Sequence, residues 1–247
     1  MASYDLVFEG GGAKGSCFVG ALEALQAAGH THRRLVGTSA GAITATLLAA
    51  GFTPKEMLAA VNERLPNGKP RFSSFMDPPS KEDFSEVQVQ NSETMAVLRT
   101  VRFPWIPNFD WLDGRILNAL LKSRLYCHLF VFVENGGLFS GKAFRLWINE
   151  KLAVKGIAEG ATLEDFAQQT QSDLSLVVSD TSDMEMLVLN HRTAPKCPVA
   201  WAVRMSMSIP FIWNEVVWQA SWGDTWAARK PKTASWTEAY CPISLYA

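Results

Sequence analysis

Hydrophobic and polar positions change their period several times near the start of the chain, and each change predicts a new element. Residues 4–9 are rich in β-forming residues and stop at glycines, which predicts a short buried strand. Residues 18–28 carry apolar side chains at helical spacing and precede Gly29, which predicts a helix. A second short strand is expected over residues 35–37, and the small, continuously apolar stretch 40–50 predicts a buried helix.

The rest of the chain continues this alternation after an irregular stretch. Residues 66–112 hold prolines among Phe and Trp, and we interpret them as an insertion with the character of a lid. Strands that alternate with helices predict an α/β fold, with a mostly parallel central sheet flanked by helices and a site at the carboxyl ends of the strands. The remaining pattern predicts helices at 115–125, 142–154 and 199–207, and strands at 174–179, 184–189 and 215–218. Capped helix starts are expected at Thr53-Pro54 and at Thr162 to Asp165.

Composition narrows the class of protein. The 247 residues are enough for one sizeable domain, and 48% of them are hydrophobic, as in globular proteins. The net charge of −1 provides no basic field for nucleic acid. The four cysteines form no CxxC pair, which argues against a zinc site and a dense disulfide framework, and no metal or cofactor is expected. With neither a signal-like start nor about 18 consecutive apolar residues, we expect a cytoplasmic protein whose membrane contact is peripheral.

The first candidate motif is the glycine-rich loop over residues 10–15, which follows a predicted strand and opens a helix. Glycines allow positive φ and bring amide groups close to a ligand, and the helix start adds unsatisfied donors for an anion. The spacing also matches the dinucleotide fingerprint G-x-G-x-x-G. Read alone, the loop fits dinucleotide binding, oxyanion stabilisation and a structural turn equally well.

The second motif is G-x-S-x-G over residues 37–41, between a predicted strand and a predicted helix. A sharp turn in this context projects the Ser39 hydroxyl from the sheet, as in a nucleophile elbow. Gly37 and Gly41 remove side chains that would clash with the turn's neighbours, and the Ala40 amide adds to an anion site. The alternative for this motif alone is a helix capped by Thr38 or Ser39.

The two motifs together favour acyl transfer. They follow the first and second strands, and parallel neighbours place both loops at one edge of the sheet, where nucleophile and oxyanion donors meet. A dinucleotide site also needs an acidic residue at the end of the second strand, and residues 36–38 supply none. An ordinary α/β-hydrolase has several strands before its elbow and a downstream histidine. His191 in a predicted turn is the one downstream candidate, and a surface histidine is the simpler interpretation.

These motifs make the chain similar to the patatin-like phospholipase family from about residue 4 to about residue 218, with residues 179–181, 198–200 and 206–210 resembling later blocks. The resemblance implies a patatin-like three-layer sandwich and a lipid acyl-ester hydrolase in lipid catabolism that uses a Ser-Asp dyad without metal. The implied partners are a phospholipid or another acyl ester. The implied residues are the nucleophile Ser39, the oxyanion-hole residues Gly10, Gly11, Gly12 and Ala40, and the supporting residues Lys14, Gly15, Gly37 and Gly41.

The sequence departs from the family pattern where the catalytic base is expected. No Asp-Gly turn follows Pro210, Asp224 is the only aspartate after it, and Asp113-Gly114 comes far too early. Five of the nine tryptophans fall in the last 35 residues. Residues 219–247 are therefore expected to be a tail foreign to the family, which a frameshift or a misplaced stop produced. Two alternatives for the base stay open. Either Asp224 serves as the base, or the chain has no base and is a catalytically impaired lipid-binding protein.

Aromatic residues gather in the proline-broken segment 103–111. Its Trp and Phe side chains would suit a lipid interface or an acyl channel, and a loop packed on the core by these side chains is the alternative. Arg115, Lys122 and Arg124 suit phosphate headgroups, and an ordinary solvated helix face explains them equally well.

Overall fold

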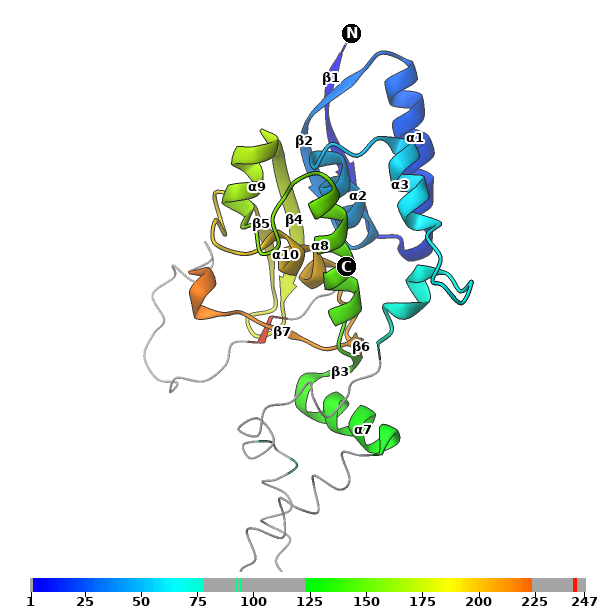
Figure 1. The fold of residues 1–247 in the computed structure, drawn as a ribbon. Coiled ribbons are helices and arrows are strands. Elements are labelled where there is room, and N and C mark those ends of the chain that lie inside the picture. The colour runs from blue at the N-terminus through cyan, green and yellow to red at the C-terminus, as the bar shows by residue number, and fades with distance from the viewer. Residues whose placement is uncertain (1, 78–91, 93, 95–122, 224–241, 244–247) are drawn as a thin grey trace, which may run out of the picture. The chain divides into compact units, whose positions relative to one another are not determined.

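A four-stranded sheet in the order β1-β2-β4-β5 forms the centre of the fold (Figure 1). Its strands are β1 (Ser3–Phe8), β2 (Thr31–Gly37), β4 (Asp173–Asp180) and β5 (Glu185–Leu189). β1 runs parallel to β2 and β2 parallel to β4, while β5 returns antiparallel to β4. The expected α/β class with a mostly parallel central sheet is confirmed.

The computed structural model describes residues 2–77, 92, 94, 123–223 and 242–243. Contacts divide the chain into two units. The larger unit comprises residues 1–75, 142–209 and 215–247 and contains the sheet, and the smaller comprises residues 76–141 and 210–214.

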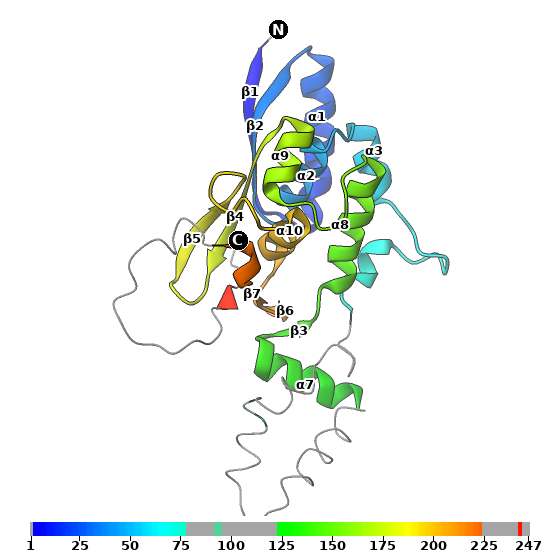
Figure 2. The same cartoon turned by 60° about the vertical axis from the view of Figure 1, so that its left-hand side comes forward.

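Helices flank the sheet of the larger unit, and Figures 1 and 2 show α1, α2, α3 and α8 on the same side of β1 and β2. α2 contacts β1, β2 and β4, whereas α10 contacts β4, α2 and α8. α8 and α10 begin and end at the residues that the sequence pattern predicted, whereas β2 begins four residues earlier than the predicted strand at 35–37. The helices are α1 (Ser16–Ala27), α2 (Ala40–Ala49), α3 (Pro54–Val61), α8 (Lys142–Val154), α9 (Leu163–Thr170) and α10 (Val199–Met207).

Local sequence explains where two of these helices begin. The Thr53 side chain accepts the Glu56 amide and the Glu56 carboxylate accepts the Thr53 amide, which completes a capping box at the start of α3. Thr162 and Asp165 form the same reciprocal pair at the start of α9. Each box satisfies amide groups that would otherwise lack partners in the first turn, so the predicted capped starts are confirmed.

The expectation that the first strand is buried was wrong. β1 lies at the edge of the sheet, and only Phe8 of its six residues is buried, while Val7 is 74% exposed. An edge strand has a neighbour on one side only, so its apolar composition does not ensure burial. β4, which has strands on both sides, instead alternates strictly between buried and half-buried positions.

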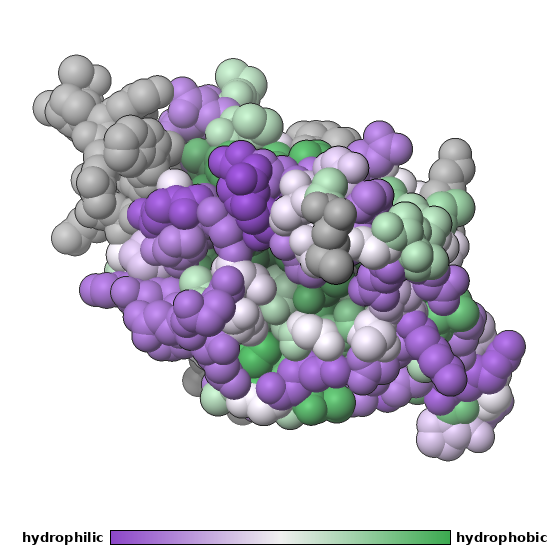
Figure 3. Space-filling view, turned by 90° about the horizontal axis from the view of Figure 1, so that it is seen from above, coloured by the Kyte–Doolittle hydropathy of each residue, from purple (hydrophilic) through white to green (hydrophobic). Residues whose placement is uncertain are grey.

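Charged side chains connect β1 and β2. The Asp5 carboxylate on β1 accepts hydrogen bonds from Arg33 and Arg34 on β2, with Arg33 Nε at 3.2 Å and Arg34 Nε at 3.0 Å. Figure 3 looks onto the molecule from above, and its coloured part is mostly hydrophilic with hydrophobic residues between. Asp5 is the third residue of β1, and Arg33 and Arg34 are the third and fourth residues of β2, so these pairs lie before the carboxyl ends of both strands.

The smaller unit contains a helix that the sequence pattern did not predict, α7 (Arg124–Asn135). It is followed by β3 (Gly137–Phe139), which pairs parallel with β6 (Phe211–Trp213). Most of the expected insertion at 66–112 and of the expected helix at 115–125 lies outside the described residues. The short elements left are the 3-10 turns η1 (Gly12–Gly15), η2 (Arg71–Ser74) and η4 (Ala220–Trp222), and the paired strands β7 (Val216–Val217) and β8 (Pro242–Ile243).

Candidate active site

The strands β1 and β2 end side by side, so the loops that follow them begin at one place. Phe8 pairs with Gly37 at the last position of both strands. One residue later, the Thr38 amide donates a hydrogen bond to the Phe8 carbonyl at 3.1 Å. α2, which follows the second loop, contacts η1, which is part of the first. The glycine-rich loop and the serine loop are therefore neighbours at the carboxyl edge of the sheet.

Ser39 has a backbone conformation that few residues with a side chain adopt. Its φ is 53° and its ψ is −120°, and it directly precedes α2 without capping the helix through its own hydroxyl. A non-glycine residue in such a region costs about 1–3 kcal/mol and persists only where its surroundings enforce it. The Ser39 residue is half-buried, so part of it reaches solvent at the start of the helix.

Glycines on both sides of Ser39 permit this tight turn. A Cβ atom on Gly37 would lie 2.4 Å from the Gly41 carbonyl oxygen, and one on Gly41 would lie 2.1 Å from the Phe8 carbonyl oxygen. Both distances are far below any real contact, and both involve backbone atoms that cannot move aside. The start of α2 thus crosses directly over the end of β1, which only glycine at position 41 allows.

Ser206 on α10 holds the turn from the other side, and sequence reasoning gave this residue no role. Its hydroxyl is buried, accepts the Ser39 amide at 2.9 Å and donates to the Val177 carbonyl of β4 at 2.7 Å. The Ser39 amide is therefore occupied. The signal available in the sequence was a serine within a mostly apolar helical stretch, which is compatible with many roles.

Several amides around Ser39 have no acceptor in the described part of the chain. Gly10, Gly11 and Ala40 donate no hydrogen bond from their main chain to any described group. Gly10, Gly11 and Gly12 are exposed, and Gly12 has a φ of 52°. Unsatisfied amides at the start of an α-helix carry partial positive charge and favour an anion.

The predicted supporting residues lie in the same loop. Gly15 packs against the start of α2, where a Cβ atom would lie 3.0 Å from the Cβ of Ala40. A larger residue at position 15 would push the two loops apart. Lys14 belongs to η1, and its side chain is outside the described part of the structure.

An apolar cavity of about 310 Å³ begins beside these loops. Gly12, Gly15 and Ala40 form part of its lining, and the rest comes mostly from apolar side chains of α1, α2, α3 and α8 together with Phe72 of η2. A cavity of this size with few polar groups is typical of a site for the hydrocarbon part of a ligand. The sequence pattern does not reveal this cavity, because its walls come from segments distant along the chain.

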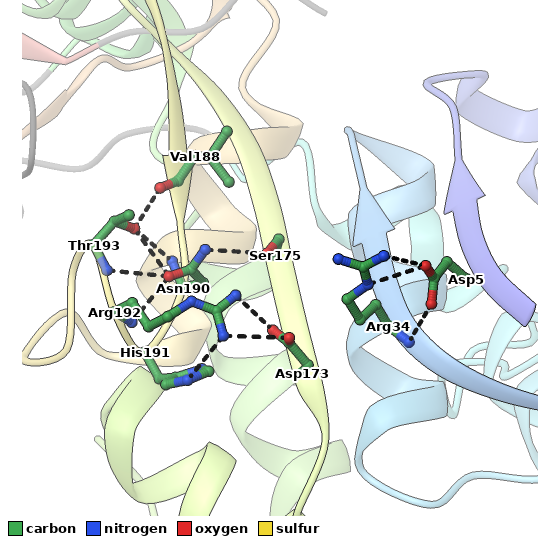
Figure 4. A network of polar contacts seen from close by, with 9 residues as sticks. All are labelled: Asp5, Arg34, Asp173, Ser175, Val188, Asn190, His191, Arg192 and Thr193. Carbon is green, nitrogen blue, oxygen red and sulfur yellow. Dashed lines mark hydrogen bonds and ion pairs between the residues drawn. The ribbon is translucent and has the colours of Figure 1, made fainter.

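The turn that carries His191 lies toward the amino ends of the strands, away from the Ser39 loop. Arg192 in this turn donates to Asp173 at 3.0 Å and to His191 Nε2 at 3.3 Å (Figure 4). Asp173 on β4 lies opposite Arg34 in the register of β2, and Arg34 comes five residues before Ser39 along the chain. His191 is therefore half-buried in a polar turn network, where the simpler interpretation of the sequence expected a surface histidine.

Asp224 and Asp113-Gly114, the aspartates of the sequence considered for the catalytic base, lie outside the described residues, as does most of the expected foreign tail. Within the described ranges, no three His, Cys, Asp or Glu side chains gather as a metal site would require. None of the helices in that part of the chain is long and apolar enough to cross a membrane.

The chain is similar to several known proteins. A bacterial relative, the uncharacterized protein YqhO of Bacillus subtilis (strain 168), is 30% identical over 218 residues, which are 86% of this chain and 57% of that protein. The chain thus spans little more than half of its relative's length. Among solved structures, the type III effector protein ExoU matches with a TM-score of 0.42 at 23% identity, and the match covers 83% of this chain and 39% of the ExoU chain. VipD from Legionella pneumophila has a TM-score of 0.41 at 21% identity, with 88% and 44% covered. The family model for patatin-like phospholipase matches residues 6–227, and the chain belongs to the patatin-like phospholipase family.

Proposed function

We propose that this chain hydrolyses acyl esters of lipids, phospholipids among them, with Ser39 as its nucleophile. The observation that carries the proposal is the strained turn at Ser39, which the Ser206 hydroxyl and two obligatory glycines enforce. Strain of this kind persists at functional sites more often than elsewhere. Membership of the patatin-like phospholipase family supports a lipid hydrolase in general.

The chemistry follows from the neighbouring groups. The Ser39 oxygen attacks the ester carbonyl carbon while a base takes the hydroxyl proton, and the carbonyl oxygen becomes an oxyanion. Amides of Gly10, Gly11, Gly12 and Ala40 stabilise that oxyanion. The base then returns the proton to the departing alcohol, and water releases the fatty acid from the acyl-enzyme. Loss of one such donor costs about a hundredfold or more in rate.

The apolar cavity supplies a place for the acyl chain. Its lining includes Gly12 of the oxyanion loop and Ala40 next to the nucleophile. An ester carbonyl held at the loops therefore has an apolar space beside it for its hydrocarbon chain. Removal of that chain from water supplies binding free energy of about 0.8 kcal/mol for each methylene group.

Asp224 is the base in this proposal, since it is the only aspartate after Pro210. In this proposal a family domain spans residues 4–218 and a tail spans residues 219–247. Contact with the lipid surface is peripheral and is made by the aromatic segment 103–111. Both segments that matter here, the tail and the aromatic segment, are largely outside the described residues.

The second candidate function is a lipid-binding protein without turnover. The observation that favours it is the lack of an Asp-Gly turn after Pro210 in the sequence. Such a protein would keep the cavity and the serine loop but would have no group to accept the Ser39 proton.

Ester hydrolysis by wild type, Ser39→Ala and Asp224→Asn separates these functions. The proposal predicts release of fatty acid from phospholipid vesicles and from a soluble short-chain ester by the wild type, and loss of at least about a hundredfold in both variants. Activity that survives in Ser39→Ala would exclude the nucleophile, and full activity in Asp224→Asn would exclude that base. No turnover by the wild type, together with binding of the same lipid, would establish the second function.

A further inference from the structure

The apolar cavity follows one face of α2 inward from the nucleophile. Ala40, Ile43, Thr44 and Leu47 all line it. Their spacing places them in a single stripe along the helix. At 1.5 Å of rise per residue, the stripe from Ala40 to Leu47 is about 10 Å long. A chain that enters beside Ser39 therefore has a defined and limited depth along this helix.

Trp147 of α8 is the largest side chain in the lining and is almost fully buried at 2% exposure. Its indole Nε1 donates to Glu63 Oε2 at 2.9 Å. The ring centroid of Phe75 lies 5.3 Å away, and that of Phe144 lies 6.1 Å away. The indole is thus held by a hydrogen bond at its polar edge and by aromatic rings along its apolar part.

The hydrogen-bond acceptor of Trp147 is itself fixed. Lys151 Nζ donates to the other Glu63 oxygen, Oε1, at 3.0 Å, and lies 5.8 Å from the centroid of the Trp147 ring. Burial alone would raise the pKa of the Glu63 carboxyl, but hydrogen bonds from Lys151 and Trp147 bring it below its usual value. Glu63 is therefore ionised at neutral pH, and Trp147 forms a rigid wall.

The length of the cavity along α2 limits what fits against that wall. An extended hydrocarbon chain advances about 1.3 Å per carbon, from bonds of about 1.5 Å, so the stripe of about 10 Å accommodates about eight carbons beyond the ester carbonyl. Longer chains would leave methylene groups outside the cavity or would force the wall to move. Interiors that are already close-packed resist such movement.

We propose that the cavity selects acyl chains of medium length, about eight to ten carbons, and that Trp147 is the residue that sets the upper limit. This inference rests on the proposed function, because it takes the cavity to be the acyl site of Ser39. Trp147 determines specificity here by its bulk and its fixed position. Glu63 is a positioning residue, since it acts only through Trp147.

The test compares rates of Ser39 phosphonylation by alkyl fluorophosphonates with chains of 4, 8, 10, 12 and 16 carbons. We expect the wild-type rate to peak at about 8–10 carbons and to fall at least about tenfold by 16. Trp147→Ala is expected to move the peak to longer chains and to raise the 16-carbon rate above that of the wild type. Trp201→Ala, the same change at a tryptophan outside the lining, is expected to leave the profile unchanged.

A second variant covers the case in which Trp147→Ala does not fold, since truncation of a buried tryptophan costs about 3–5 kcal/mol. Val61→Phe fills the cavity from α3 and is expected to move the peak to chains shorter than eight carbons. An equal rate for 8 and 16 carbons in the wild type, or an unchanged profile in Val61→Phe, would overturn the inference.

Failure of the proposed function has a different signature. If no fluorophosphonate of any length reacts, Ser39 is not an activated nucleophile, and binding of saturated fatty acids to Ser39→Ala, measured by calorimetry, becomes the readout. Tightest binding at about 8–10 carbons, with a shift to longer chains in Trp147→Phe, upholds the selection by the cavity. Affinity that rises steadily to 16 carbons in both proteins overturns it.

Discussion

The Ser206 hydroxyl accepts the Ser39 amide at 2.9 Å and donates its own proton to the Val177 carbonyl at 2.7 Å. One buried side chain therefore connects α10, the turn before α2 and the central strand β4. The connection fixes the backbone of Ser39 relative to the sheet and occupies an amide that would otherwise lack a partner. Among the described residues, it also leaves the Ala40 amide as the first donor of α2 without an acceptor.

Replacement of Ser206 by alanine is expected to impair Ser39 much more than it impairs folding. The loss leaves the Ser39 amide unsatisfied at a cost of about 1–3 kcal/mol, which allows the strained turn to relax. A displacement of about 1 Å at a reacting group can reduce the rate by about a hundredfold. We expect kcat for a short-chain ester to fall by about ten- to a hundredfold, with KM nearly unchanged.

Ser208→Ala is the matched control for this variant. Ser208 is equally buried on the same segment, but its hydroxyl pairs with Arg204 and does not contact Ser39. Both variants should lower the melting temperature, while only Ser206→Ala should lower kcat. Equal loss of activity in both would mean that the Ser39–Ser206 bond has no specific role, and Ser206→Thr should restore part of the rate.

Gly41→Ala is expected to disrupt the turn itself. The added Cβ atom would lie 2.1 Å from the Phe8 carbonyl oxygen, so α2 must separate from β1. We expect loss of several kcal/mol in the free energy of unfolding, measured by denaturant titration. Gly20→Ala, in α1 where a Cβ atom meets nothing within 4 Å, should instead stabilise the protein by about 0.5–1 kcal/mol. A stable, active Gly41→Ala protein would contradict the described crossing.

Glu56 is expected to make folding stability depend on pH in the acid range. Hydrogen bonds from Lys155 at 2.8 Å and from the Thr53 amide at 2.7 Å lower the pKa of its carboxyl to about 2. A carboxyl whose pKa is lower in the folded state stabilises the fold above its unfolded value of 4.5, and this contribution disappears as the pH falls toward about 2.

Denaturant titrations of wild type and Glu56→Gln at several pH values test this linkage. The variant should be the less stable protein at pH 6, and the difference should shrink steadily as the pH decreases from about 4.5 to about 2. A difference that is constant over this range would show that the Glu56 charge does not contribute and that only the packing of its side chain matters.

The sequence predicted those features that depend on local chemistry. Gly37 and Gly41 were expected to be required by the turn, and the Cβ contacts at both positions confirm this. The capping pair Thr162 and Asp165 and the helix from Val199 to Met207 are local features as well, since caps and periodicity lie within a few residues.

Features that arise from distant segments could not be predicted. The bond between Ser39 and Ser206 joins residues 167 positions apart and depends on how α10 crosses the sheet. The cavity requires α2, α3 and α8 to meet, and Trp147 acquires its position from Glu63, 84 residues earlier. The edge position of β1 likewise follows from the order of the strands, which periodicity does not determine.

The central claim is that Ser39 is an activated nucleophile, and phosphonylation by a fluorophosphonate tests it most directly. Intact-mass spectrometry after incubation should show one added phosphonyl group, and peptide mapping should place it on Ser39, with no addition to Ser39→Ala under the same conditions. The protein unmodified at reagent concentrations that saturate known serine hydrolases, or labelled at another residue in both proteins, would contradict the account.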